Sequence, residues 1–297
     1  MTLVMVEGEK LKLSNLSKLM WPEDGITKAD FINYFVQIAP YLLPHLKDRP
    51  VVFTRYPEGI HGESFYQKNA PDYAPDWLNT YTVVSFSGGQ KKEIRYVLIN
   101  DLKSLVWAAN QASLEIHPWL SRIGSIDYPD FAVFDLDPME NTDFEDARFL
   151  ALALKRLLEM EGLKGFPKTS GATGIQVYVP LESRYTYRQV RTFAEFFCRV
   201  LEKTFPEKAT IERNVKKRKG RVYLDYLQNV KGKTLIAPYS PRPFKGAPVS
   251  APVTWDELER GVVPSMFTVK NMPERLKKTG DLFKGVLEER QKIDRWL

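Results

Sequence analysis

Two carboxylates two positions apart end one of the most apolar segments of the chain. They are Asp135 and Asp137 in the string FAVFDLD, residues 131–137. Alternate residues of a β-strand point to the same face, so the two acids would project side by side while Leu136 turns to the other face. Adjacent carboxylates repel each other, and a divalent cation that prefers oxygen ligands, such as Mg²⁺ or Mn²⁺, would relieve the repulsion. The alternative is a solvated pair of turn carboxylates.

A third carboxylate, Asp225, lies in the strand-like string RVYLDYLQ, residues 221–228. Burial of an unpaired charge is costly, so this acid needs a cationic partner. A salt bridge to a nearby Arg or Lys would satisfy it, and so would a metal ion shared with Asp135 and Asp137. Three carboxylates on adjacent strands suffice for a two-metal phosphoryl-transfer site, in which one ion activates the attacking hydroxyl and the other neutralises the leaving pyrophosphate.

Phosphate-binding candidates accompany the acids. In KTSGATG, residues 168–174, the glycines would let backbone N–H groups approach an anion, and Lys168, Thr169 and Ser170 add donors. The string is not a Walker A loop, because its lysine precedes the glycines. An ordinary glycine turn between two elements is the alternative. Basic residues also crowd into KKRKGR, residues 216–221, which is either a solvated loop or a polyanion contact.

The amino-acid composition limits the class of protein to which this chain can belong. A chain of 297 residues with 43% hydrophobic content can bury a large core. Lys and Arg number 43 against 37 for Asp and Glu, a net charge of +6, which is compatible with polyanion binding. The single cysteine, Cys198, excludes a disulfide framework and a cysteine-based zinc cluster. No stretch reaches the ~20 apolar residues of a membrane span, so we expect a cytoplasmic protein without membrane association.

The elements predicted around the acids alternate between strands and helices. They are a strand at 131–137, a helix at about 142–160, a strand at 175–181, a helix at 187–204 and a strand at 221–228. This order is typical of α/β folds. Beyond residue 237 the chain becomes rich in proline, and we expect it to wrap a finished core before a charged helical tail.

Upstream of the acids the pattern is more mixed. We expect a short helix over 27–43 that Thr27 caps and Pro40 interrupts, strands at 49–56, 81–86 and 93–99, and a helical segment over 101–115.

Five strings in one order carry a family resemblance: LEIHPWLSR, FDLDP, PKTSGATGIQVYVPL, GRVYLDYLQN and GKTLIAPYSPRPFKGAPVSAPVTWDEL. Together they resemble the polymerase domain of the bacterial ligase D family, within the archaeo-eukaryotic primase superfamily, from about residue 15 to residue 258. The resemblance implies an α/β (α+β), primase-polymerase-like fold with central β-sheets flanked by helices and the active site between them. It implies a DNA-dependent nucleotidyltransferase that extends primer 3′ ends at gaps or double-strand breaks from NTPs or dNTPs, in end joining or gap repair.

The resemblance also implies roles for single residues. Two Mn²⁺ or Mg²⁺ ions would be held by catalytic Asp135, Asp137 and Asp225. The incoming nucleotide would be contacted by His117, Lys168, Ser170, Arg218 and Arg242. A downstream 5′-phosphate would be bound by Lys18 and Lys28 with Asn15 nearby, while Phe65 and Tyr66 would stack on template bases. Members of the family often use ribonucleotides and manganese.

The resemblance implies a single catalytic domain over residues 1–297, with a 5′-phosphate-binding region at 10–70, a catalytic core at 95–245 and a C-terminal wrap at 246–297. No K-x-D-G adenylation motif occurs in the sequence. Either the chain is an excised domain, or it acts with a separate DNA ligase and a Ku-like protein. Its other expected partners are NTP or dNTP and DNA with a gap or end that bears a 5′-phosphate, so a nucleoid-associated location is expected.

Two other functions compete with this prediction. Haloacid dehalogenase-like phosphatases also have an apolar strand that ends in D-x-D, but they continue with Gly and Thr where this chain has Pro138 and Met139. Their first Asp is a covalent nucleophile. A non-catalytic DNA-end-binding module would explain the basic segment and the aromatics, but it would leave the three acids without a role.

Overall fold

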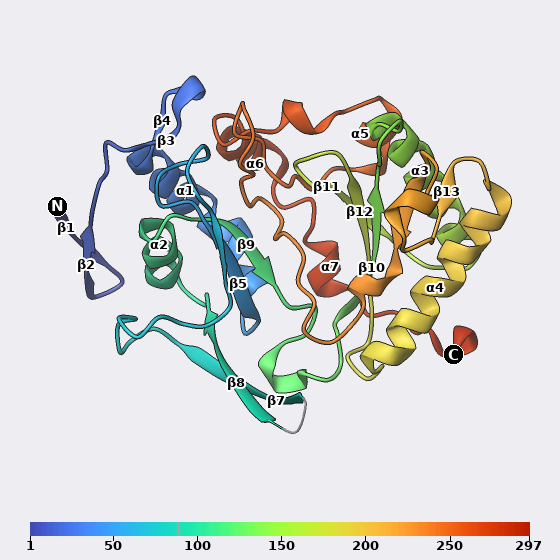
Figure 1. Ribbon diagram of the computed structural model, residues 1–297, viewed down its shortest axis with the longest axis horizontal. Coiled ribbons are helices and arrows are strands. Elements are labelled where there is room, and N and C mark those ends of the chain that lie inside the picture. The colour runs from blue at the N-terminus through green and yellow to red at the C-terminus, as the bar shows by residue number, and fades with distance from the viewer. Residues whose placement is uncertain (88–89) are drawn as a thin grey trace. The chain divides into compact units, whose positions relative to one another are not determined.

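The computed structural model describes residues 1–87 and 90–297. The chain forms two compact units, each assembled from segments distant in the sequence. Unit 1 comprises Met1–Gly124, Thr234–Val249 and Thr268–Gly280, and unit 2 comprises Ser125–Lys233, Ser250–Phe267 and Asp281–Leu297. Several sheets and helices make up the units (Figure 1), which confirms the predicted mixed α/β class. The division into one domain with a 5′-phosphate region, a core and a wrap stays a prediction.

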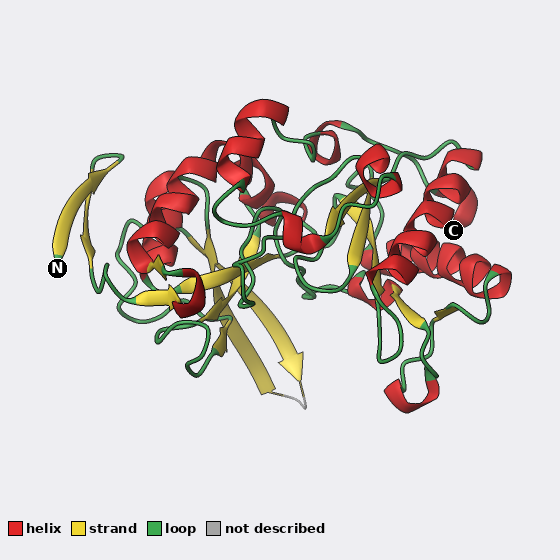
Figure 2. Ribbon diagram, turned by 90° about the horizontal axis from the view of Figure 1, so that it is seen from above, coloured by secondary structure: helices red, strands yellow, loops and turns green. Residues whose placement is uncertain are grey.

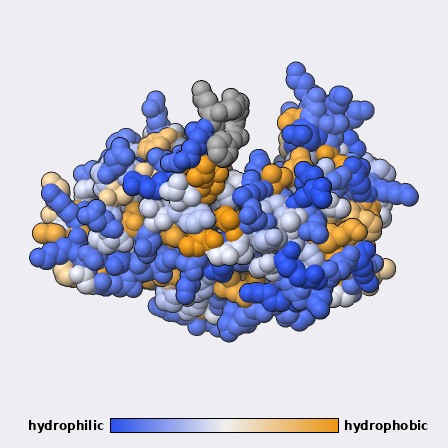
Figure 3. All heavy atoms as spheres, turned by 90° about the horizontal axis from the view of Figure 1, so that it is seen from below, coloured by the Kyte–Doolittle hydropathy of each residue, from blue (hydrophilic) through white to orange (hydrophobic). Residues whose placement is uncertain are grey.

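Charged and polar side chains predominate on the face drawn in Figure 3, where apolar residues form separate patches. No helix in the described residues is long and apolar enough to cross a membrane.

In its described residues, unit 1 contains three sheets and three α-helices. Its strands are β1 (Thr2–Val6), β2 (Glu9–Leu13), β3 (Leu19–Trp21), β4 (Ile26–Thr27), β5 (Pro50–Arg55), β6 (Phe65–Gln67), β7 (Thr80–Ser87), β8 (Gln90–Leu98) and β9 (Ser113–Pro118). Its helices are α1 (Lys28–Leu46), α2 (Leu102–Asn110) and α6 (Met272–Thr279). The largest sheet has the order β6-β5-β8-β7, and β9 also pairs with β5. In Figure 2, β7 and β8 run together as a long ribbon.

Helix α1 is longer than predicted and passes through two prolines. Thr27 caps it as expected, in a capping box with Asp30. Pro40 does not interrupt the helix, so that prediction is wrong. Pro40 and Pro44 both lie on the exposed side, where water can satisfy the carbonyls that lose an N–H partner. The buried face, which includes Phe31, Phe35 and Ile38, continues on the other side of the helix.

The helical segment predicted over 101–115 is correct only in its first part. Asp101 caps α2, which ends at Asn110, and Ala112 takes a left-handed backbone conformation with φ of 56°. The chain then starts β9 at Ser113. Pairing with β5 decides this outcome, because the residues from Ser113 to Pro118 form a ladder with that strand.

Unit 2 is built on one five-stranded sheet with the order β11-β12-β10-β14-β13. Its strands are β10 (Phe131–Asp137), β11 (Phe166–Thr169), β12 (Ile175–Pro180), β13 (Ala209–Thr210) and β14 (Val222–Asp225). Its helices are α3 (Phe144–Met160), α4 (Tyr187–Thr204), α5 (Trp255–Glu259) and α7 (Gly285–Glu288). All strand pairs are antiparallel except β13 with β14. The predicted alternation therefore missed two short strands, β11 and β13.

The last predicted strand of the core ends earlier than expected. The chain leaves β14 at Asp225 and forms a 3₁₀ turn, Tyr226–Gln228. The Asp225 carboxylate causes this change locally, since it accepts the N–H of Leu227 at 3.0 Å and caps the turn.

Aromatic packing shows which face of the unit 2 sheet is covered by helix α4. The ring centre of Phe134 lies 6.1 Å from that of Phe193 and 6.0 Å from that of Phe197, and both of these residues are on α4. Because neighbouring residues of a strand point to opposite faces, Asp135 lies on the face away from α4. The face covered by α4 is thus apolar, and the acids lie on the opposite face.

Candidate active site

The strand register brings the predicted metal ligands together. Asp135 in β10 is paired directly with Asp225 in β14, and Asp137 is paired with Tyr223. Paired residues of antiparallel strands project to the same face with their Cβ atoms ~5 Å apart. Asp225 is therefore the immediate cross-strand neighbour of Asp135, as the sequence predicted.

A polar row extends from these acids across four strands. Gln176 in β12 is paired with Asp135 on one side and with Lys168 in β11 on the other. Lys168, Gln176, Asp135 and Asp225 thus lie in one line on one face of the sheet. This line joins a residue predicted to bind the triphosphate to residues predicted to bind metal.

Asp135 is the buried acid of the row. Its side chain is buried, and Oδ1 has no hydrogen-bond partner. Burial raises the pKa of Asp135 well above its ordinary value and the charges of Asp137 and Asp225 raise it further, while the hydrogen bond from Gln176 and the charge of Lys168 lower it. A negative charge at this position is therefore unfavourable until a cation arrives.

The donor set fits a divalent cation at Asp135 and Asp137. A buried carboxylate oxygen without a partner, next to a second carboxylate, is the environment that a hard cation satisfies. In the described part of the chain, however, no three His, Cys, Asp or Glu side chains are grouped as a metal site. The oxygens of Asp225 accept hydrogen bonds from the Leu227 N–H and the Gln228 side chain.

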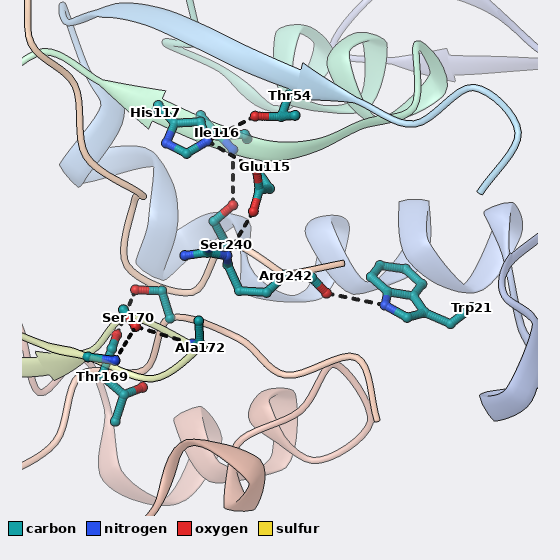
Figure 4. Close-up of polar contacts among 12 residues, drawn as sticks. Trp21, Thr54, Glu115, Ile116, His117, Thr169, Ser170, Ala172, Ser240 and Arg242 are labelled. Carbon is teal, nitrogen blue, oxygen red and sulfur yellow. Dashed lines mark hydrogen bonds and ion pairs between the residues drawn. The ribbon is translucent and has the colours of Figure 1, made fainter. Parts of the chain in front are cut away.

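The string KTSGATG forms a tight turn beside Asp137. Oγ of Ser170 accepts N–H groups from Ala172 at 3.2 Å and from Gly174 at 3.0 Å (Figure 4). A Cβ at Gly174 would lie 2.7 Å from the Leu136 carbonyl oxygen and 3.0 Å from Oδ1 of Asp137, so only glycine fits there. The turn is thus packed directly against the second acid.

Lys168 and Arg218, two predicted nucleotide contacts, lie on the same side of unit 2 as the acids. Lys168 is fully buried, and its Nζ donates to Oγ of Ser250 at 2.5 Å. The Arg218 guanidinium lies 3.6 Å from the ring centre of Tyr223, the residue paired with Asp137. Stacking of this kind holds the guanidinium plane in a defined direction.

Two further predicted nucleotide contacts, His117 and Arg242, belong to unit 1, where Glu115 links them (Figure 4). Oε1 of Glu115 lies 2.7 Å from Nε of Arg242, and Oε2 lies 3.4 Å from Nε2 of His117. Oγ1 of Thr54 lies 3.2 Å from the same Nε2 atom. Burial opposes ionisation of Glu115, but the hydrogen bond to His117 and the charge of Arg242 outweigh it and lower the pKa of Glu115.

The predicted 5′-phosphate ligands converge in unit 1. The Lys28 N–H donates to the Lys18 carbonyl at 2.7 Å, and the Lys18 N–H donates to the Asn15 carbonyl at 3.0 Å. Lys28 is 5% exposed, and its Nζ donates to the Ser14 carbonyl at 2.8 Å. Burial, with smaller contributions from Lys18 and Arg55, lowers the pKa of Lys28 to about 8. The Lys18 ammonium is paired with Glu58 at 2.7 Å, whereas the nearly buried Lys28 ammonium has neutral acceptors and therefore favours an anionic ligand.

Phe65 and Tyr66 are both exposed, at 45% and 52%, so neither packs in the core. They do not share a face, however. Phe65 is paired with Arg55, whose guanidinium lies 5.0 Å from its ring centre. Tyr66 is paired with Thr54, and its ring centre lies 6.1 Å from that of His117. The two aromatics therefore offer separate stacking surfaces.

Sequence reasoning missed Glu115 and Gln176. Glu115 precedes His117 by two positions, and this spacing on a strand would have placed both side chains on one face. The prediction of a helix through Glu115 concealed that relation. Gln176 gave no sequence signal, because its role follows only from the register of β12 with both neighbouring strands.

Comparison with known proteins gives one consistent result. The profile of the family described as "LigD, primase-polymerase domain" matches residues 27–283. The chain is 41% identical over 272 residues to the bifunctional non-homologous end joining protein LigD of Bacillus subtilis, and 36% identical over 256 residues to the multifunctional LigD of Mycolicibacterium smegmatis. These matches cover 91% and 86% of this chain but 43% and 33% of those relatives.

A solved structure agrees with the sequence matches. The polymerase domain from Mycobacterium tuberculosis Ligase D in complex with DNA is similar with a TM-score of 0.87 at 32% identity, and the similarity covers 95% of this chain and 99% of that one. The family match over most of the chain and the identity to several LigD proteins lead to one assignment. The chain belongs to the LigD primase-polymerase domain family, whose members are metal-dependent nucleotidyltransferases.

Proposed function

We propose that this chain extends the 3′ end of a primer strand at a DNA gap or break, directed by the template strand, from NTPs or dNTPs. One observation carries the proposal: Asp135, with an unpartnered buried oxygen, stands beside Asp137 and opposite Asp225, in a row that ends at Lys168. Acids and a lysine in such a row suit a triphosphate with its accompanying cations better than they suit a neutral substrate.

In this proposal Asp135, Asp137 and Asp225 hold two Mn²⁺ or Mg²⁺ ions, which supply activation of the primer hydroxyl and charge neutralisation at the triphosphate. Lys168 and Arg218 donate to phosphate oxygens, Lys168 from its buried place in β11 and Arg218 from its stack on Tyr223. Ser170, whose Oγ accepts the N–H groups of Ala172 and Gly174 within the turn of residues 168–174, is proposed to contact the nucleotide as well. His117 and Arg242 are proposed as further contacts to the nucleotide.

We also propose that Lys28 and Lys18, with Asn15 nearby, bind the 5′-phosphate on the downstream side of the gap. The lowered pKa of Lys28 supports this, because a phosphate would give a counter-charge to an ammonium whose acceptors, the carbonyl and hydroxyl of Ser14, are neutral. Exposed Phe65 and Tyr66 are proposed to stack on template bases. The DNA substrate, a separate ligase, a Ku-like protein and a location at the nucleoid in the cytoplasm follow as proposals from this role.

The test combines a gapped, 5′-phosphorylated DNA with labelled nucleotides and either Mn²⁺ or Mg²⁺. We expect template-directed extension by the wild type, and none by the Asp137→Ala variant, with DNA affinity retained. The matched control is Asp127→Ala, which removes an exposed acid paired with Lys231 and should leave extension unchanged. Extension by Asp137→Ala would remove that residue from the mechanism. Phosphate release from a generic ester, or DNA binding without turnover, would refute the proposed reaction.

A further inference from the structure

One buried carboxylate, that of Glu115, joins the two side chains of unit 1 that are proposed to contact the nucleotide. Its side chain is 8% exposed, and each of its oxygens faces a different partner. Oε1 lies 2.7 Å from Nε of Arg242, and Oε2 lies 3.4 Å from Nε2 of His117. The carboxylate therefore couples a residue of strand β9 to a residue of the distant segment Thr234–Val249.

The pairing of strands β9 and β5 fixes the position of the Glu115 carboxylate. Glu115 and His117 are two residues apart on β9, and Thr54 in β5 is paired directly with Glu115. The Thr54 hydroxyl hydrogen-bonds Glu115 and also lies 3.2 Å from Nε2 of His117. On the other segment, Oγ of Ser240 accepts the Ile116 N–H at 3.0 Å, which ties the loop that carries Arg242 to the same strand.

The contacts also determine which nitrogen of the His117 ring carries a proton. Glu115 is ionised, since its pKa is lowered despite burial, and an ionised carboxylate can only accept hydrogen bonds. Nε2 of His117 therefore carries the proton that lies between Glu115 and Thr54. Nδ1 is then the ring nitrogen that remains for a ligand.

We propose that Glu115 is a positioning residue that fixes the ring orientation and tautomer of His117 and the direction of the Arg242 guanidinium before the nucleotide binds. The inference rests on the proposed function, in which both residues contact the incoming nucleotide. Donors that are already oriented lose less conformational entropy on binding. Because they bind the nucleotide in the ground state as well as the transition state, loss of the orientation raises KM and leaves kcat nearly unchanged.

The first test is Glu115→Gln, which keeps the side-chain volume but places an NH₂ group against either His117 or Arg242. One of the two contacts then becomes donor against donor. We expect the KM for nucleotide to rise about tenfold, the effect of one lost charge-assisted hydrogen bond, with kcat and gapped-DNA affinity changed less than about twofold. The control is Glu9→Gln, which removes an outlying acid near Lys103 and should change neither value.

A spectroscopic signature separates orientation from simple structural damage. The chain has three histidines, so the ¹⁵N resonances of the His117 ring can be assigned. We expect the Nε2–H tautomer in the wild type and a shift toward the Nδ1–H form in Glu115→Gln. An unchanged KM and tautomer in this variant would overturn the inference. Should the variant not fold, Thr54→Val tests the same network with an expected KM rise of about threefold, and an unchanged KM there would equally overturn it.

The variant His117→Ala distinguishes failure of this inference from failure of the proposed function. If His117→Ala raises the KM for nucleotide while Glu115→Gln does not, Glu115 does not position His117 although the proposed contact stands. If His117→Ala leaves KM unchanged, the proposed nucleotide contact itself fails, and the positioning role fails with it. If both raise KM, the double variant should be little worse than the more impaired single variant, because the residues act as one unit.

Discussion

Replacement of Lys28 by methionine should make the DNA-free protein more stable while it impairs recognition of the 5′-phosphate. Lys28 is 5% exposed, and its Nζ has the Ser14 carbonyl at 2.8 Å and the Ser14 hydroxyl at 3.5 Å as acceptors. Neither acceptor carries a charge. Methionine has a similar length and no charge, so Lys28→Met removes an ammonium whose burial opposes folding.

The size of the effect follows from the pKa of Lys28, which falls from its ordinary value of 10.5 to about 8. At 1.36 kcal/mol per pH unit this depression corresponds to about 3 kcal/mol, an upper bound. The ammonium keeps its hydrogen bonds to Ser14 and partial contact with water, so we expect Lys28→Met to raise the free energy of unfolding by about 1 to 2 kcal/mol at pH 7.

The pH dependence has a definite sign. Between pH 8 and 10.5 the folded protein has lost the Lys28 proton while the unfolded chain still holds it. The unfolded state then binds more protons, so the contribution of this residue to stability rises with pH through that window. Urea denaturation at several pH values should show this rise in the wild type and a smaller rise in Lys28→Met. Lys12→Met, at an exposed position of β2, is the control and should follow the wild type.

Two results would refute the reasoning. If Lys28→Met is less stable than the wild type at pH 7, burial of the charge does not oppose folding. If the variant keeps the preference for 5′-phosphorylated DNA, the charge does not serve phosphate recognition. In the wild type, affinity for the 5′-phosphate should also fall as the pH rises above about 8, because the ammonium that binds the anion is lost.

Three further predictions concern the acids, the turn beside them and the DNA. Asp135→Asn should raise the melting temperature of the metal-free protein at neutral pH, since a raised pKa means that the charged form of Asp135 opposes folding. The same variant should abolish the further rise in melting temperature that Mn²⁺ gives the wild type. An undiminished response to Mn²⁺ would contradict this. Gly174→Ala should slow nucleotide incorporation at least about tenfold, because the new Cβ would lie 2.7 Å from the Leu136 carbonyl oxygen and 3.0 Å from Asp137; Gly124→Ala, which meets nothing within 4 Å, is its control. Affinity for gapped DNA should fall steeply between 50 and 200 mM salt, and Lys28→Met should reduce the slope of log K against log salt by about 1. A binding constant that is insensitive to salt would exclude phosphate contacts as the main source of affinity.

Local patterns in the sequence predicted the parts of the site that depend on neighbours along the chain. The period of two in a strand was enough to place Asp135 and Asp137 on one face, and the strand itself spans the predicted residues 131–137. Thr27 likewise marked the start of α1 as its cap, and the structure adds a capping box with Asp30. In each case the interacting groups lie within a few residues of one another, so no knowledge of tertiary structure was needed.

The errors arose where tertiary contacts override local preference. Pro40 is an interior helix position that the sequence disfavours, yet the buried residues on the opposite side of α1 keep the helix continuous. Ser113 to Glu115 suit a helix as well as a strand, and only pairing with β5 decides between them. The end of β14 at Asp225 follows from a side-chain cap rather than from the apolar alternation.

The charged residues show most clearly why the rest of the site could not be predicted from the sequence. In the sequence, Lys28 is one of 43 basic residues, and Glu115 is one of 37 acidic ones. Burial separates these two from most of the others, since Lys28 is 5% and Glu115 6% exposed; Arg49, Lys168, Asp130 and Asp135 are buried as well. A buried charge persists in a fold only where partners or a ligand compensate it. Glu115 has its compensation in His117 and Arg242. Within the described residues, the hydrogen-bond acceptors of the Lys28 ammonium are the neutral ones of Ser14, which is why we propose an anion at Lys28 and none at Glu115.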